Sequence, residues 1–307
     1  MGLFMLYGIV DIGSNTVRLN VYHYKDNEIS LLFSKKENLV LVFFIKKGKL
    51  ANKGIEKLVN FLKKIKNDLD NLKIKSYSFF STAVLRNIEN SDYVIQIIKD
   101  KIDIEIDLLS GEEEGELSFF GSVSTIKKDN GILIDLGGGS VEIVLFKNKK
   151  IKEKYTIPIG SLKMYHEYVS DIIPDKIESN SIKERTYSEL EKIGINNEEK
   201  ILFMCGVGGS IRTIEKILLD LNLQKKKADL IEVKLLKKLK KELNHNNKDT
   251  YNKILQLKPS RIHTLVPALL ILESITSYFG CEEIQTSKNS VREGYLFKKV
   301  LNRYQNV

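Results

Sequence analysis

The sequence is poor in the residues that build disulfide scaffolds and metal clusters. It contains two cysteines and four histidines among 307 residues, and none of them has the spacing of a metal-ligand motif. We therefore expect reduced thiols and a reducing compartment. No apolar run approaches the roughly 20 residues that span a bilayer, and the N-terminus lacks the basic region of a signal peptide. These absences predict a cytoplasmic protein that does not associate with membranes.

Two other absences concern motifs. No G-x-x-x-x-G-K-[ST] sequence occurs, so the chain has no P-loop, and no Pro- or Ser-rich linker stands out. The formal net charge of +9 favours polyanionic partners, although a solvated basic surface gives the same balance. In the basic stretch Lys225–Lys241, a leucine stripe at helical spacing makes the lysines a solvent face rather than a nucleic-acid helix. The length allows two domains with cores of their own.

The most informative stretch is GILIDLGGGSVEIVLF (131–146). An apolar strand ends at Asp135, three glycines and Ser140 form a turn, and a second strand follows. Three glycines allow backbone N–H groups to approach an anion closely. A carboxylate at the end of a strand is the usual place for a ligand-facing acid in an open α/β sheet. By itself the stretch could also be a glycine-rich hairpin without chemistry.

A second copy strengthens the functional interpretation. YGIVDIGSNTVRLNVYHY (7–24) has the same layout, with Asp11 at the end of a strand and Gly13 to Thr16 in the turn. This duplication predicts two similar α/β lobes that face each other across a cleft. Asp11 and Asp135 are oxygen ligands suited to Mg²⁺. Neutral donors for phosphate oxygens would come from the turn amides and from four side chains: Ser14, Asn15, Thr16 and Ser140.

Further residues could take part in phosphate chemistry. Arg18 and Arg86 are candidates for charge-assisted phosphate contacts, whereas a polar face in solvent and a local salt bridge are their structural alternatives. The loop Gly206–Ser210 follows a short strand and precedes a helix, an order that suits a phosphate or nucleotide or close helix packing. Glu113 and Glu114 could be helix N-terminal charge, or one of them could accept a proton from an attacking water.

Seven segments in chain order resemble the exopolyphosphatase / guanosine pentaphosphate phosphatase (Ppx/GppA) family, part of the actin, heat-shock chaperone and sugar kinase superfamily. They are DIGSNTVRL (11–19), STAVLRNIEN (81–90), SGEEEGELSFFG (110–121), IDLGGGSVEIV (134–144), IPIGSLKMY (157–165), GVGGSIRTI (206–214) and SVREGYL (290–296). The resemblance implies two ribonuclease-H-like lobes with the active site in the cleft between them. We place the lobes at residues 1–122 and 123–307, with a final helix at 290–305 that could pack back on the first lobe.

The resemblance also implies an activity, namely Mg²⁺-dependent hydrolysis of the terminal phosphoanhydride of inorganic polyphosphate, with pppGpp as a second candidate substrate and a homodimer as the assembly. Glu114 falls on the family's catalytic base, and Asp135 falls on its metal- and phosphate-site aspartate, with Asp11 and Glu142 beside it. Phosphate-contacting positions correspond to Ser14, Asn15, Arg86, Gly138, Gly139 and Ser140. Our own interpretation of the turns and loops adds Thr16, Arg18, Gly137, Gly208, Gly209 and Ser210.

The chain departs from the family pattern at two places. Glu116 stands where the family usually has a basic residue, and the stretch 39–50 reads LVLVFFIKKGKL where an Arg-Leu-Gly segment is common. We expect a strand over Asn38–Ile45.

Two other hypotheses about the function remain open. One is a polyphosphate/nucleotide kinase, in which Gly206–Ser210 would hold an adenosine. The other is a non-catalytic polyphosphate or alarmone sensor.

Overall fold

Contacts divide the chain into two α/β units, Met1–Ser110 and Gly111–Val307. The computed structural model describes residues 5–25, 28–195, 200–225, 230–243 and 248–304. We predicted the boundary after residue 122, whereas the contacts divide the chain after Ser110. The residues between the two boundaries form one helix, α4 (Gly111–Ser122), which belongs to the second unit.

The first unit is built on a five-stranded sheet in the order β3-β2-β1-β6-β7. Its strands are β1 (Met5–Ile12), β2 (Val17–Lys25), β3 (Glu28–Glu37), β6 (Ser76–Ser81) and β7 (Ile106–Leu108). Its longer helices are α1 (Asn52–Asn71) and α3 (Ser91–Ile102); the short elements are α2 (Ala83–Arg86), the 3₁₀ helix η1 (Leu41–Phe44), β4 (Ile45–Lys46) and β5 (Lys49–Leu50). Apolar residues at helical spacing bury one face of α1 against the sheet.

The predicted strand over Asn38–Ile45 is wrong. Asn38 and Leu39 belong to no element, Leu41–Phe44 is a 3₁₀ helix, and Val40 adopts left-handed backbone angles (φ 52°). Apolar residues of this run are buried as a packed turn, since Leu39 and Leu41 join the first core. A short apolar run cannot distinguish a strand from such a turn by periodicity alone.

The second unit repeats the sheet of the first. The strand order β10-β9-β8-β11-β13-β12 reproduces β3-β2-β1-β6-β7 and adds one edge strand. These strands are β8 (Gly131–Leu136), β9 (Val141–Lys147), β10 (Lys150–Ile157), β11 (Phe203–Val207), β12 (Ile231–Glu232) and β13 (Glu283–Thr286). In the first sheet, β1 forms a hairpin with β2 and pairs in parallel with β6. In the second sheet, β8 forms a hairpin with β9 and pairs in parallel with β11. The predicted duplication is therefore confirmed.

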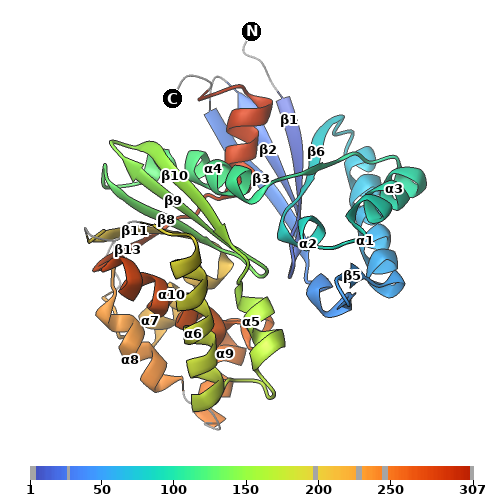
Figure 1. Ribbon diagram of the computed structural model, residues 1–307. Coiled ribbons are helices and arrows are strands. Elements are labelled where there is room, and N and C mark those ends of the chain that lie inside the picture. The colour runs from blue at the N-terminus through green and yellow to red at the C-terminus, as the bar shows by residue number, and fades with distance from the viewer. Residues whose placement is uncertain (1–4, 26–27, 196–199, 226–229, 244–247, 305–307) are drawn as a thin grey trace. The chain divides into compact units, whose positions relative to one another are not determined.

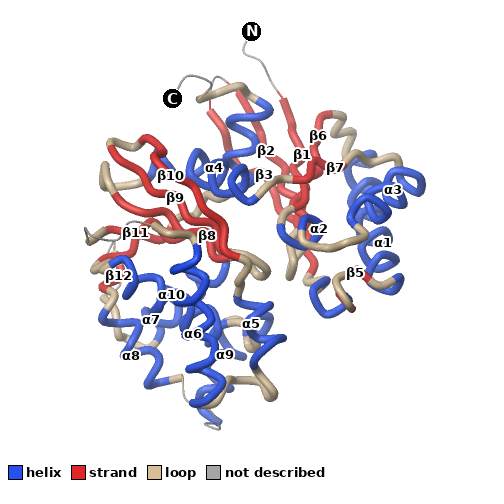
Figure 2. Tube along the Cα trace, viewed as in Figure 1, coloured by secondary structure: helices blue, strands red, loops and turns tan. Residues whose placement is uncertain are grey.

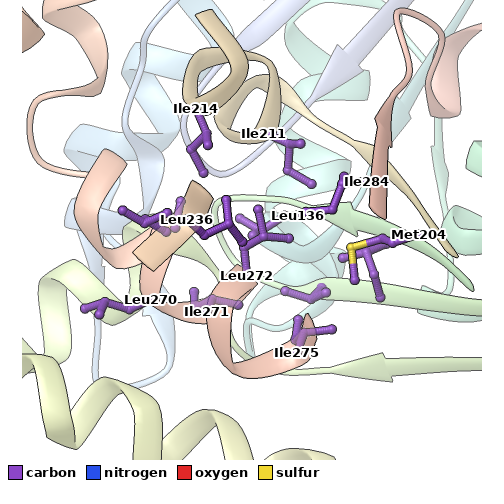
Figure 3. Close-up of a cluster of buried hydrophobic side chains, with 14 of the residues drawn as sticks. Leu136, Met204, Ile211, Ile214, Leu236, Leu270, Ile271, Leu272, Ile275 and Ile284 are labelled. Atoms are coloured by element: carbon purple, nitrogen blue, oxygen red, sulfur yellow. The ribbon is translucent and has the colours of Figure 1, made fainter. Parts of the chain in front are cut away.

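Helices cover both faces of the second sheet (Figures 1 and 2). One face carries α4, which packs on β8, β9 and β10. The other carries α5 (Ser161–Tyr168), α6 (Lys176–Lys192), α7 (Gly209–Asp220), α8 (Lys234–Glu242), α9 (Lys248–Leu257) and α10 (Leu265–Phe279). The largest core of the protein lies on that face, where α10 is buried between neighbouring helices (Figure 3).

The final helix is shorter than predicted and changes type. α11 (Val291–Tyr295) begins with a capping box between Ser290 and Glu293 and continues as a π-helical turn, η4 (Leu296–Val300). α11 packs on α4, so it belongs to the second unit. Gln305, the last residue of the predicted helix, lies outside the described residues. The short 3₁₀ turns η2 (Val123–Thr125) and η3 (Pro259–Arg261) complete the unit.

Candidate active site

In the second unit, strand alternation directs two carboxylates toward α4. Ile132, Ile134 and Leu136 of β8 join the large core on the far face, so Leu133 and Asp135 point the other way. Asp135 pairs directly with Glu142 of β9, and directly opposed residues in an antiparallel pair share a face. Asp135 and Glu142 are buried, with Asp135 8% exposed and Glu142 fully buried. The structure thus brings these two predicted residues together.

Helix α4 supplies the groups that cover these carboxylates. The Ser118 hydroxyl donates a hydrogen bond to Oδ2 of Asp135. Glu114 lies four residues earlier, on the same helix face as Ser118, and only 8% of it is exposed. Gly115 approaches β9 so closely that an added Cβ would lie 3.3 Å from Cβ of Glu142. Glu114 is therefore held on the helix face that covers Asp135 and Glu142.

The glycine turn between β8 and β9 has the predicted form. The Gly137 N–H donates to the Ser140 carbonyl at 3.1 Å, and the Ser140 hydroxyl donates to Oε1 of Glu142 at 2.5 Å. Gly138 and Gly139 lie between these ends of the turn. The side chain of Ser140 thus contacts a carboxylate in this structure, while the turn contributes its backbone as a candidate phosphate site.

The loop before α7 also reaches Asp135. Gly208 has φ 111°, a conformation that side chains disfavour, and an added Cβ would lie 3.4 Å from Oδ1 of Asp135 and 2.7 Å from the Leu136 carbonyl oxygen. Only glycine fits at this position. Gly209 and Ser210 open α7, and the Arg261 guanidinium donates to the Ser210 hydroxyl at 3.1 Å.

Positive charge lies next to the carboxylates. Arg212 of α7 donates to the Ser287 carbonyl at 3.0 Å. Burial and the neighbouring Arg292 lower the pKa of Arg212, while the carboxylates of Asp135, Glu293 and others act in the opposite direction. Burial, reinforced by the charge of Asp135, raises the pKa of the Cys205 thiol to about 12. Arg212 and Cys205 therefore both lie within electrostatic reach of Asp135.

The first unit presents the matching set of groups. Asp11 pairs with Arg18 in the β1–β2 hairpin, and both point away from the core that contains Val10, Ile12, Val17 and Leu19. Gly13 N–H donates to the Thr16 carbonyl at 3.1 Å, the same closure as in the second hairpin. Arg18 thus occupies in the first unit the position that Glu142 occupies in the second.

The remaining predicted residues of the first unit lie near Asp11, at the end of the sheet where β1 and β6 finish. The Asn15 carbonyl accepts from Val40 N–H at 3.0 Å, and the Thr16 hydroxyl donates to Asn38 at 3.0 Å. Ser14 is buried. Arg86 ends α2, directly after β6, and donates to the Leu109 carbonyl at 3.0 Å. β1 and β6 are parallel, so Asp11 and α2 lie at one edge.

Asp135 and Glu142 form a donor set that fits Mg²⁺. This ion is commonly held by one or two carboxylates, with water and substrate phosphates completing its octahedron. The two carboxylates lie on one face, and an added Cβ at Gly208 would enter the space beside Asp135. Among the described residues, no group of three or more His, Cys, Asp or Glu side chains is placed to hold a metal ion.

Comparison with known proteins identifies the family. The model of the Ppx/GppA phosphatase family matches residues 20–303. The chain belongs to this family. The Fusobacterium nucleatum bifunctional 3-dehydroquinate synthase/phosphatase is 28% identical over 314 residues, which cover 96% of this chain and 46% of that protein. The putative exopolyphosphatase of Haemophilus influenzae is 23% identical over 94% of this chain and 89% of its own length. The chain thus spans about half of the first relative and most of the second.

Solved structures confirm the fold. The exopolyphosphatase from Cytophaga hutchinsonii has a TM-score of 0.85 at 21% identity, with 97% of this chain and 99% of that chain covered. The Ppx/GppA family member of Aquifex aeolicus has a TM-score of 0.78 at 22% identity, with coverage of 98% and 99%. In the described part of the present chain, none of the helices combines the length and the hydrophobicity that a membrane span requires.

Sequence reasoning missed three polar residues of the second unit. Ser118 could have been found from its place one helical turn after Glu114. Arg212 follows the glycine loop within the segment GVGGSIRTI, and this place next to the loop could have indicated it. Arg261 comes from a distant turn, and nothing in its local pattern points to Ser210. Only the tertiary structure identifies Arg261.

Proposed function

We propose that this Ppx/GppA family member hydrolyses the terminal phosphoanhydride bond of inorganic polyphosphate and releases orthophosphate. The observation that carries the proposal is the placement of Glu114. This buried carboxylate lies on the face of α4 that covers Asp135 and Glu142, and Ser118 of the same face hydrogen-bonds Asp135. A carboxylate beside a phosphate site can act as a general base toward water.

In the proposed mechanism, Glu114 accepts a proton from the water that attacks the terminal phosphorus. The P–O bond to the next phosphate breaks, so one water and a chain of n phosphates give orthophosphate and a chain of n − 1. Positioning and charge stabilisation carry most of phosphoryl-transfer catalysis. We assign these roles to backbone and side-chain groups of the two units: Ser14, Asn15, Thr16, Arg18, Arg86, Gly137, Gly138, Gly139, Ser140, Gly208, Gly209 and Ser210.

Asp135 and Glu142, with Asp11 of the first unit, are the residues we propose for Mg²⁺. The bound ion would neutralise phosphate oxygens and polarise the phosphorus. Ser118 would keep the Asp135 carboxylate in place by occupying one of its oxygens. Arg261 is a further candidate for a phosphate contact at the start of α7. Its guanidinium lies at Ser210, and a guanidinium matches the geometry of phosphate oxygens.

The test measures orthophosphate release with Mg²⁺ from short polyphosphate, long polyphosphate and pppGpp, each with and without ADP. Release from polyphosphate without ADP supports the hydrolase, and the comparison with pppGpp decides the second substrate. ATP formed only when ADP is present would replace the proposal by a kinase. Binding of polyphosphate without any turnover would replace it by a sensor.

A further inference from the structure

A carboxylate on α4 is held between two lysines from distant parts of the chain. Glu116 forms ion pairs with Lys154 of β10 and with Lys298 of η4. The three side chains are 19%, 27% and 32% exposed, respectively. Lys298 also lies over the Phe120 ring, 4.9 Å from its centroid. Two ammonium groups therefore converge on one anion at the surface of the second unit.

This cluster lies on the same two turns of α4 as Glu114. Glu116 follows Glu114 by two residues, so the two α-carbons are about 5 Å apart while the two side chains leave different faces of the helix. Glu113 lies three residues before Glu116, on the same face of the helix, and pairs with Lys299 at 3.5 Å. Lysines of the single short element η4 thus pair with both Glu113 and Glu116, and three ammonium groups gather along one face of the first turns of α4.

We propose that Lys154 and Lys298 form a binding subsite for a phosphate group of the substrate. In this proposal the Glu116 carboxylate competes with that phosphate group for the two lysines. The proposal rests on the proposed function for the identity of that substrate. Ion pairs that water can reach are weak, so a phosphate chain with several charges can displace one carboxylate from its two partners. Glu116 then lowers the affinity for polyanions, and the lysines raise it.

The primary test is direct binding of sodium tripolyphosphate, measured by titration calorimetry at low salt. Glu116→Gln keeps the shape of the side chain and releases both lysines, so we expect tripolyphosphate to bind about fivefold more tightly. The gain should shrink as ionic strength rises, because salt screens exposed charges. Unchanged or weaker binding in a folded Glu116→Gln variant would overturn the proposal.

A matched control is available on α6, which lies on the opposite face of the sheet. Glu189 is held between Arg185 at 3.0 Å and Lys192 at 2.7 Å. Glu189→Gln changes the net charge by the same amount and also releases two cations. We expect no change in tripolyphosphate affinity in this variant. An equal gain in both variants would assign the effect to overall charge and would contradict the subsite.

Two further variants test the lysines without altering Glu116. Lys154→Met and Lys298→Met keep an apolar stem and remove the ammonium group, so each should weaken tripolyphosphate binding and raise KM for polyphosphate, with kcat within about twofold. Glu116→Gln combined with Lys298→Met should return toward wild-type affinity. If Glu116 only clamps α4, Glu116→Gln lowers the melting temperature and kcat, and both lysine variants keep wild-type affinity.

Failure of the subsite and failure of the proposed function give different results. Without orthophosphate release by the wild type, the hydrolase fails, while the order of tripolyphosphate affinities among the variants still decides the subsite. With normal release by the wild type and equal affinities in all variants, the subsite fails and the hydrolase stands.

Discussion

Ser118 of α4 donates its hydroxyl hydrogen bond to Asp135 at the end of β8. The contact joins the helix that carries Glu114 to the sheet edge that carries both buried carboxylates, Asp135 and Glu142. A buried carboxylate needs donors to compensate for lost water. This hydrogen bond therefore adds a polar contact to the packing that holds Glu114 over the two carboxylates.

Ser118→Ala should lower kcat/KM about tenfold, because it leaves one oxygen of buried Asp135 without this donor. Orthophosphate release measures the effect. Ser122→Ala is the matched control, since Ser122 is also a fully buried serine, one turn later on α4, and it contacts Ser287 and Asn289 instead. Equal losses in the two variants would indicate a general packing defect of α4 rather than a role for the contact with Asp135.

Glu114→Gln should reduce orthophosphate release by about 10²-fold or more, as expected when a general base is lost. Tripolyphosphate binding should survive, because the glutamine keeps the size of the side chain. Glu112→Gln, in the same helical turn but exposed, provides the control and should retain activity. Turnover at the wild-type level in Glu114→Gln would remove Glu114 from the mechanism.

Arg86→Ala should raise KM more than it lowers kcat, because a group that holds the substrate contributes equally to the ground and transition states. Arg86 also donates to the Leu109 carbonyl at 3.0 Å, so the melting temperature must be measured beside the kinetics. Arg86→Lys keeps the charge and should recover part of the KM. A pure kcat defect would contradict a binding role.

Gly294→Ala should destabilise the second unit by about 3 kcal/mol, because the methyl group overpacks the contact between α11 and α4. An added Cβ at Gly294 would lie 1.7 Å from the Leu117 carbonyl oxygen, and one at Gly121 would lie 2.3 Å from that of Ser290. Urea denaturation measures the loss. Gly194→Ala, which meets no atom within 4 Å but has φ 62°, should cost only about 1 kcal/mol.

Stability should fall between pH 9 and pH 12 because of the two cysteines. Burial raises the pKa of Cys205 and of Cys281 from 9.0 to about 12. Above pH 9 the unfolded thiols lose protons that the folded thiols retain, so the free energy of unfolding decreases as pH rises. At pH 10.5 the loss is about 2 kcal/mol per cysteine.

Denaturation at pH 8 and pH 10.5 tests this prediction. A double variant, Cys205→Ala and Cys281→Ala, should lose less stability between these pH values than the wild type, whatever other groups titrate in both proteins. Equal alkaline losses would show that the thiols ionise as readily in the folded protein as in the unfolded chain.

Much of the fold could be predicted because it depends on local patterns. The two hairpins follow from an apolar run, an aspartate and a glycine turn, and both close with the same backbone hydrogen bond in the structure. Apolar residues at helical spacing predict a helix over Gly54–Leu69, and this range is part of α1. The run at 38–45 misled us, because burial of a short apolar segment does not require a strand.

The family, the duplicated α/β units and the place of Asp11, Glu114 and Asp135 on their elements can be inferred from the sequence, since these features depend on residues close along the chain. Three contacts are visible only in the folded protein: Ser118 with Asp135, Arg261 with Ser210, and Glu116 with Lys154 and Lys298. These partners come from distant elements, and their meeting depends on how helices pack across a sheet. Local patterns of hydrophobicity and turn residues do not encode that packing.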